Sequence, residues 1–224
     1  MDSLLLNFFN LGILQQAWPY LLKGLGMTVL LCIVVIPLGV AGGLAVALAA
    51  RAPRRWMRWA VIAYVDFFRA FPPLVLLMFL AFGLPFLGVD LPAFAAVALA
   101  FLLNTSSYYG EIFRAGIESI PRGQFEAARS LGLSARQYMR HVVLPQAAKN
   151  VLPDLIGNTL EVVKLTSIAS VVALPELLYA ARQAQAVTYN ATPIIAAGII
   201  YLVCLWPLVR LLSRFEHKQL DVYN

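Results

Sequence analysis

The sequence has little charge and few residues that could hold a metal or form a disulfide. Only 12% of its 224 residues are charged, whereas 61% are hydrophobic, and the mean hydropathy is +0.79. This composition excludes an ordinary soluble domain and is typical of membrane proteins. Cys32 and Cys204 both lie in apolar runs, so we expect unpaired, buried thiols. His141 and His217 are isolated from other ligating residues, and we expect no metal site.

The charge is positive overall, and no basic segment opens the chain. Asp2 and no Lys or Arg precede Lys23, so the n-region of a secretory signal is missing and we expect the N-terminus to be retained. A net charge of +6 would suggest nucleic acid binding in a soluble protein, but in a membrane protein the placement of cations matters more than their sum. We therefore expect lipid and no nucleic acid as a partner.

Long apolar runs predict about five membrane-spanning helices in a single domain over residues 1–224. Crossing about 30 Å of hydrocarbon takes roughly 20 apolar residues. Runs of about this length or longer predict an all-α integral membrane protein. The predicted spans are residues 25–50, 59–87, 91–113, 152–174 and 192–212.

The cations alternate between the connections and predict the topology. Thirteen of the seventeen Lys and Arg residues follow the first, third and fifth spans, whereas the second connection carries none and the fourth only Arg182. Short cytoplasmic loops are enriched in Lys and Arg. We therefore expect a membrane protein with its N-terminus outside and its C-terminus in the cytoplasm.

The segments around the first span suggest interfacial contact and close packing. Aromatic residues among polar neighbours in the first twenty residues are typical of a segment lying on the outer leaflet, although a frayed tail is equally compatible. Gly39, Gly42 and Gly43 form a small-residue surface that lets another helix approach closely.

Two adjacent prolines interrupt the second predicted span. Pro72 and Pro73 remove two backbone donors, so we expect a bent or broken helix whose freed carbonyl groups need partners. Such a break is tolerated against protein or a water-lined cavity. It indicates either part of a transport pathway or a kinked packing helix.

A polar segment of about thirty residues separates the third and fourth predicted spans. In residues 119–147, Pro121 suits a first helical position and Gly132 a left-handed helix end. Ser134 with Gln137 predicts a capping box for a second helix over 135–143, which Pro145 helps to end. The pattern predicts helix, sharp turn, helix.

These residues carry a family resemblance. Glu126, Ala127 and Ala128, then three residues, Gly132, nine residues and Val142, Val143, Leu144, Pro145 resemble the EAA loop of ABC import permeases. Val142 stands where the family more often has Ile. The segments RAGIESIPRGQFEAARSLGLS, LPQAAKNVLPDLIGN and VKLTSIAS are similar to the polar amino acid permease branch, and the resemblance extends from about residue 21 to 216.

The resemblance implies a type I importer with several chains, located in the cell (inner) membrane of a bacterium. This chain would be one of two membrane subunits, identical or paralogous, that work with two cytoplasmic ATPase subunits and an extracytoplasmic solute-binding protein to import a polar amino acid. No cofactor is expected in this chain, since ATP and Mg would be bound by the ATPase subunits. The absence of a G-x-x-x-x-G-K-[ST] loop agrees with a chain that is not an enzyme itself. The implied ATPase-coupling residues are Glu126, Ala127, Ala128, Gly132 and Leu133.

Ionisable residues inside the predicted spans form a second candidate site. Lys164 lies roughly 18 Å into the fourth span, near the midplane, with Glu161 one turn away. These two, with Asn104 and Thr166, are our candidates for a polar substrate path, although a structural ion pair and hydroxyls bonded to local carbonyls are equally compatible. We expect Asp66 with Arg69, and Glu111 with Arg114, to be structural pairs. The family's second-span motif, Arg-Gly-Thr-Pro-Leu, is replaced by residues 69–73, RAFPP, which leaves the solute open.

Three other classes of membrane protein share some of these features. An ion-gradient-driven secondary transporter or channel also predicts buried charges, but we find no internal repeat, and the large polar loop would lack a purpose. A membrane enzyme would need a catalytic constellation that we do not find. A purely structural subunit would tolerate replacement of every buried charge.

Overall fold

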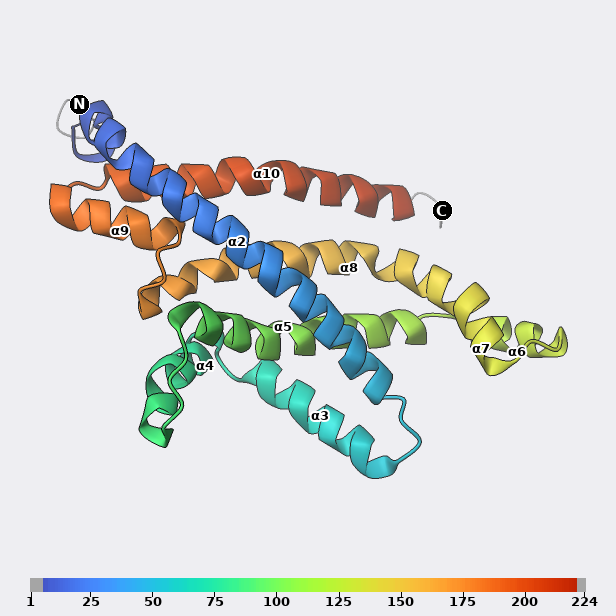
Figure 1. The fold of residues 1–224 in the computed structure, drawn as a ribbon. Helices are drawn as coiled ribbons and strands as arrows, with labels where there is room; N and C mark the ends of the chain where they lie inside the picture. The colour runs from blue at the N-terminus through green and yellow to red at the C-terminus, as the bar shows by residue number, and fades with distance from the viewer. Residues whose placement is uncertain (1–5, 221–224) are drawn as a thin grey trace. The chain divides into compact units, whose positions relative to one another are not determined.

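The computed structural model describes residues 6–220, with side chains described as far as residue 213. Within that range the backbone is helical and contains no β-strand, so the prediction of an all-α protein is confirmed (Figure 1). The elements are α2 (Leu11–Ala49), α3 (Arg55–Ala70), α4 (Pro73–Met78), η1 (Phe79–Gly83), η2 (Leu84–Leu87), α5 (Ala93–Glu118), α6 (Arg122–Ser130), α7 (Ala135–Tyr138), η3 (Met139–Val143), α8 (Leu144–Leu165), η4 (Thr166–Val172), α9 (Leu177–Thr188) and α10 (Thr192–Leu220).

Among the described residues, three helical segments are long and apolar enough to cross a membrane: Leu6–Ala49, Ala135–Val172 and Thr192–Ser213. The broken pair Arg55–Ala70 and Pro73–Leu87 adds a fourth if it counts as one span. α5 covers the predicted third span, but its C-terminal half carries a polar run together with charged residues. The count of five spans therefore stays a prediction.

The first helix begins at Leu11, well before the predicted start at residue 25. Residues that we expected to lie on the membrane surface continue α2, since Ala17 and Leu21 are buried against α9 and α10. Tertiary packing thus extends the helix through Pro19. Residues 1–5 and 221–224 of the predicted domain lie outside the described residues.

The chain divides into two compact units, and α2, α5 and α8 contribute segments to both. The first unit contains the residues up to Pro37, Pro72–Phe101, and the residues from Thr159 onward, whereas the second contains Leu38–Phe71 and Leu102–Asn158. The core of the first unit comes from α2, α9 and α10: Ala17, Leu21, Leu177, Ala181, Ala196 and Ala197.

Small residues let the helices of the second unit approach closely. A Cβ placed on Gly43 would lie 2.4 Å from Cβ of Tyr109, and one placed on Gly39 would lie 2.3 Å from the hydroxyl oxygen of Thr105. Further along α5, a Cβ on Gly116 would lie 2.3 Å from a methyl group of Val151 in α8. The predicted small-residue packing surface on α2 is therefore confirmed, and its partner is α5.

The two cysteines differ in environment. Neither forms a disulfide in the described part of the chain; Cys32 is half-buried and Cys204 is exposed on α10. The expectation of burial was wrong for Cys204, because a weakly polar side chain on a spanning helix needs no protein contact when lipid surrounds it. The described residues contain no group of three potential metal ligands.

Candidate functional site

The polar segment between α5 and α8 folds as helix, turn, helix (Figure 1). α6 ends where Gly132 adopts a positive φ of 73°. The backbone N–H groups of Leu131 and Leu133 donate to the carbonyl groups of Ala127 and Ala128, at 3.1 and 3.2 Å. These bonds satisfy the last carbonyls of α6, as glycine-terminated helix ends commonly do. The predicted sharp turn at Gly132 is confirmed.

The second helix of this motif starts as predicted but does not stop where predicted. The backbone N–H of Ser134 donates to Oε1 of Gln137 at 2.9 Å, which is the reciprocal bond of a capping box. Pro145 does not end the helix, because the wider π-helical turn Met139–Val143 precedes it and the chain continues directly into α8. Local adjustments of this kind accommodate a proline inside a helical run. α7, η3 and α8 thus form one helical connection.

The motif has an inner apolar face and an outer exposed face. Its core is formed by Ile120, Val143 and Ala147, and Phe125 and Tyr138 pack against them. The ring centroids of Phe125 and Tyr138 lie 5.8 Å apart. Among the predicted coupling residues, Ala128 is buried and Leu133 is half-buried. The other three, Glu126, Ala127 and Gly132, are exposed.

Leu131 is the residue at this turn that the sequence analysis missed. Its side chain is 79% exposed at the tip of the motif, next to Gly132. A leucine at an exposed turn is an anchor that a partner could bury. Its position directly before the glycine of the family pattern was the available signal. Exposed cations surround the tip: Arg122, Arg129, Arg136 and Arg140.

An ion-pair network lies at the C-terminal end of α5, where the helix-turn-helix motif begins. Nε of Arg114 donates to Glu111 at 2.9 Å, and its terminal nitrogens pair with Glu111 and Glu118. The hydrogen bonds that Arg114 donates to Glu111 and Glu118 raise the pKa of its guanidinium above its ordinary value, so Arg114 stays charged. The predicted pair of Glu111 and Arg114 is confirmed, with Glu118 as an additional partner.

The double-proline break is closed by side chains of α5. Pro72 and Pro73 cannot donate to the carbonyl groups four residues earlier, which are those of Phe68 and Arg69. The Nδ2 group of Asn104 donates to the carbonyl of Phe68 at 3.0 Å, and the hydroxyl of Tyr108 donates to that of Arg69 at 3.4 Å. The predicted break is confirmed, and its freed carbonyls have protein partners.

Asp66 and Arg69 do not form the predicted ion pair. No ion pair among the described residues includes either of them, and the guanidinium of Arg69 lies over the ring of Tyr108, 5.5 Å from its centroid. A cation over an aromatic face is an alternative to a carboxylate partner. Tyr108 therefore holds both the side chain and the carbonyl group of Arg69.

The other substrate-path candidates lie in the first unit. Lys164 and Glu161 form the expected ion pair, with side chains 52% and 69% exposed. Thr166 is fully buried, and its hydroxyl donates to the carbonyl of Val163 at 2.6 Å. Burial favours the local structural role for Thr166. Asn104 belongs to the second unit, where its side-chain amide donates a hydrogen bond to the Phe68 carbonyl.

A buried carboxylate that the sequence analysis did not select precedes α9. Glu176 is 0% exposed, and it accepts hydrogen bonds from the N–H groups of Leu178 and Tyr179 at 2.8 and 2.6 Å. The hydroxyl of Tyr201 donates to it at 3.2 Å. Burial raises the pKa of Glu176, and these three hydrogen bonds oppose that rise. Glu176 thus caps α9 and ties it to α10; a Glu just after a Pro and before an apolar helix was the signal.

Apolar helices, a proline-broken span and a polar helix-turn-helix between spans are the features of a multi-pass membrane protein. A sequence profile of the binding-protein-dependent transport system inner membrane components matches residues 39–220. The chain belongs to that family, and it is the membrane-spanning permease component of such a system. This finding favours the importer interpretation over an ion-gradient-driven transporter.

Characterised relatives cover most of the chain. The probable amino-acid ABC transporter permease protein YckA of Bacillus subtilis (strain 168) is 37% identical over 198 residues, 88% of each chain. The arginine transport system permease protein ArtQ of the same organism is 36% identical over 202 residues, 89% of this chain and 92% of that protein. A crystal structure of an amino acid ABC transporter with histidines has a TM-score of 0.86 at 36% identity, covering 92% of this chain and 96% of that chain. The MetNI methionine ABC transporter shares the fold, with a TM-score of 0.72 at 21% identity over 87% of this chain.

Proposed function

We propose that this chain is the permease subunit of an ATP-binding cassette importer for polar amino acids. The helix-turn-helix with its left-handed Gly132 and exposed Leu131 carries this proposal, since it supplies a compact docking element in a membrane chain. Relatives whose names refer to amino-acid, arginine, glutamine and cystine transport support the solute class. The orientation that the cations predict places this element in the cytoplasm, where ATP is available.

The docking element transmits movement from two separate ATPase subunits. Glu126, Ala127, Leu131 and Gly132 present an exposed surface to the partner, whereas buried Ala128 packs inside the motif. Because α7, η3 and α8 are continuous, displacement of the turn moves α8 directly. The network of Arg114 with Glu111 and Glu118 holds the start of the motif. ATP and Mg are bound by the ATPase subunits and not by this chain.

A second permease subunit, identical or paralogous, completes the path. The ion pair of Glu161 and Lys164 is more than half exposed on a helix that is apolar enough to cross the membrane. An ionised group facing hydrocarbon costs about 2.5–3.5 kcal/mol on insertion scales. This face therefore meets a water-filled path or the second subunit, where the pair contacts the charged groups of a zwitterionic solute delivered by the binding protein.

Reconstituted transport tests the function. The chain would be purified with co-expressed ATPase and solute-binding protein and incorporated in vesicles, and uptake of radiolabelled arginine, glutamine, histidine and cystine would be measured with ATP or with an imposed proton gradient. We expect ATP-dependent uptake of at least one of them that requires the binding protein. Uptake driven by the gradient without ATP would support the ion-gradient alternative instead.

The substrate path is tested by Lys164→Ala with Lys164→Arg as its matched control. We expect Lys164→Ala to reduce ATP-coupled uptake about tenfold or more, as for the loss of a charge-assisted contact, while solute affinity of the binding protein is unchanged. Lys164→Arg keeps the cation and should retain most of the uptake. Normal uptake by Lys164→Ala would show that the pair is structural.

A further inference from the structure

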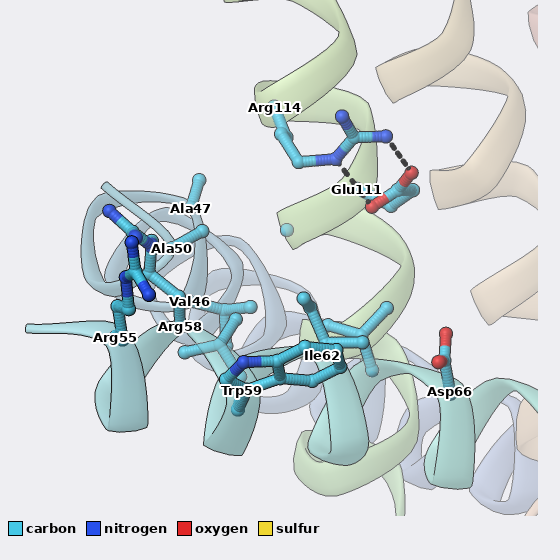
Figure 2. A pocket seen from close by; sticks show the side chains of 13 residues that line it. Val46, Ala47, Ala50, Arg55, Arg58, Trp59, Ile62, Asp66, Glu111 and Arg114 are labelled. Carbon is cyan, nitrogen blue, oxygen red and sulfur yellow. Dashed lines mark hydrogen bonds and ion pairs between the residues drawn. The ribbon is translucent and has the colours of Figure 1, made fainter. Parts of the chain in front are cut away.

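A pocket of about 740 Å³ lies within the second unit, between the C-terminal end of α2, residues 55–66 of α3 and the C-terminal half of α5. In Figure 2, Arg55 and Arg58 lie toward one end and Asp66 toward the other, with Trp59 and Ile62 between them. The volume falls within the range of about 300–1,000 Å³ that is usual for ligand sites. Of its lining residues, the proposed transport mechanism uses only Glu111 and Arg114, and it assigns no ligand to the pocket.

The cations at this pocket differ in how they are neutralised. The charge of Arg114 is matched by Glu111 and Glu118. None of the ion pairs among the described residues includes Arg55 or Arg58. No Asp or Glu occurs in the sequence between residues 2 and 66, and of the two carboxylates that line the pocket, Asp66 lies at the opposite end and Glu111 pairs with Arg114. One end of the pocket therefore carries uncompensated positive charge and fits an anion.

Apart from its charged residues, the lining is apolar and has the features of a membrane interface. Val46 and Ala47 of α2 and Ile62 and Val65 of α3 line the pocket beyond the arginines. Trp59 is 70% exposed there, and tryptophan is enriched where hydrocarbon meets water. A soluble anion would gain nothing from these apolar walls. An amphiphilic anion would gain binding free energy both from the arginines and from the apolar walls.

We propose that this pocket binds an anionic phospholipid of the membrane. Arg55 and Arg58 contact the phosphate of the headgroup, and the first carbons of an acyl chain run along Ile62 and Val65. Asp66, at the opposite end, repels an anion and so fixes the direction of the lipid. Basic pockets between membrane helices are known to bind such headgroups. The proposal requires only that the chain spans a membrane, so it stands apart from the identity of the transported solute.

The test is lipid titration of the purified full-length chain, measured by native mass spectrometry in a neutral detergent. Phosphatidylglycerol and phosphatidylcholine with identical acyl chains would be compared. We expect one phosphatidylglycerol to bind about tenfold or more tightly than phosphatidylcholine, since only the former carries a net negative charge. Equal binding of the two lipids would overturn the proposal.

A pair of double variants separates the pocket from the general positive charge of the segment. Arg55→Gln with Arg58→Gln removes two pocket cations and should abolish the preference for phosphatidylglycerol. Arg51→Gln with Arg54→Gln removes the same charge from the same connection, outside the pocket lining, and should retain it. An equal loss in both double variants would mean diffuse attraction to the membrane surface and would overturn the site.

The source of the anion is tested with a soluble headgroup and an apolar variant. Excess glycerol 3-phosphate should fail to displace the lipid, and Ile62→Gln, a change at an exposed position, should weaken phosphatidylglycerol binding. Displacement by glycerol 3-phosphate would identify a soluble-anion site and contradict the proposal. The melting temperature of each variant confirms that it is folded, and Ile62→Gln tests the site even if the arginine variant is unstable.

Discussion

The side-chain amide of Asn104 donates to the main-chain carbonyl of Phe68, the carbonyl whose usual helical donor Pro72 has removed. Asn104 is only 4% exposed, so no water replaces this bond when the donor is lost. The sequence analysis assigned Asn104 to the substrate path and separately expected the proline break to need partners. The structure connects the two expectations, since this side chain satisfies the break.

The first prediction concerns Asn104→Leu. Leucine keeps the branched shape but cannot donate to the Phe68 carbonyl, which would remain buried and unpaired. A group of this kind costs about 1–3 kcal/mol. We expect a lower melting temperature of the purified protein and reduced uptake in parallel. Loss of uptake at unchanged stability would instead place Asn104 in contact with the solute.

Tyr108→Phe is the matched comparison for that variant. Its hydroxyl donates to the Arg69 carbonyl over 3.4 Å, a longer bond, while the ring under the Arg69 guanidinium is kept. We expect a smaller loss of stability than for Asn104→Leu, on the order of 0.5–1.5 kcal/mol. A larger loss would show that the hydroxyl, and not the amide, closes the break.

Features that depend on neighbouring residues could be predicted from the sequence, whereas features that depend on tertiary contacts could not. The turn at Gly132 and the break at Pro72 follow from properties of the residues themselves: glycine adopts a positive φ readily, and proline has no backbone N–H. The start of α2 was missed because packing of Ala17 and Leu21 extends it. The prediction that Pro145 helps to end a helix was wrong, because the π-helical turn before it depends on the surrounding helix.

Charged pairs show the same limit. The three-residue spacing is shared by Glu161 with Lys164, Glu111 with Arg114 and Asp66 with Arg69, and only the first two pairs form. Arg69 lies over Tyr108 instead, and no local pattern predicts a ring contributed by another helix. Spacing indicates which groups can meet, but the competing partner decides which of them do.

A second prediction tests the close contact of α2 with α5. A methyl group at Gly43 would lie 2.4 Å from Cβ of Tyr109 and 2.8 Å from the backbone nitrogen of Gly110, so the helices would have to move apart. We expect Gly43→Ala to cost about 1–3 kcal/mol, as overpacking does, seen as a lower melting temperature.

Gly26→Ala, on the same helix, controls for helix propensity. Nothing lies within 4 Å of a Cβ at this position, so the change should be neutral or stabilising by about 0.5–1 kcal/mol. Equal stability of the two variants would mean that α2 and α5 are not held at the observed separation.

The third prediction concerns the cap of α9. Glu176→Ala removes the acceptor of two backbone N–H groups and of the Tyr201 hydroxyl, and loss of a capping side chain alone costs about 0.5–2 kcal/mol. Glu176→Gln keeps one oxygen acceptor and should fall between Glu176→Ala and the unmodified chain. Thermal denaturation gives the ranking.

Glu118→Gln is the control for removing a carboxylate. Its side chain is exposed and pairs with Arg114, and exposed ion pairs contribute about 0–1 kcal/mol. A Glu176→Ala protein as stable as Glu118→Gln would exclude a capping role for Glu176.

The fourth prediction separates the backbone conformation of the docking turn from the effect of adding a side chain to the motif. Gly132 has φ +73°, where a side chain is strained, although no atom lies within 4 Å of a Cβ placed there. Gly123, in the first turn of α6, is equally open but has no positive φ. Gly132→Ala and Gly123→Ala therefore add the same methyl group to two exposed places on one motif and differ only in backbone conformation. We expect Gly132→Ala to cost about 1 kcal/mol locally and to lower ATP-driven uptake and co-purification of the ATPase, because Leu131 is displaced.

Gly123→Ala should leave both measurements unchanged, because alanine is the better helix former at that position. If co-purification persists in Gly132→Ala while uptake is lost, the turn conformation is needed for transmitting movement and not for docking. Loss of both quantities means that the left-handed turn shapes the docking surface itself. Full activity of Gly132→Ala would contradict a coupling role for this turn, since the strain at φ +73° must then be relieved without consequence for the partner.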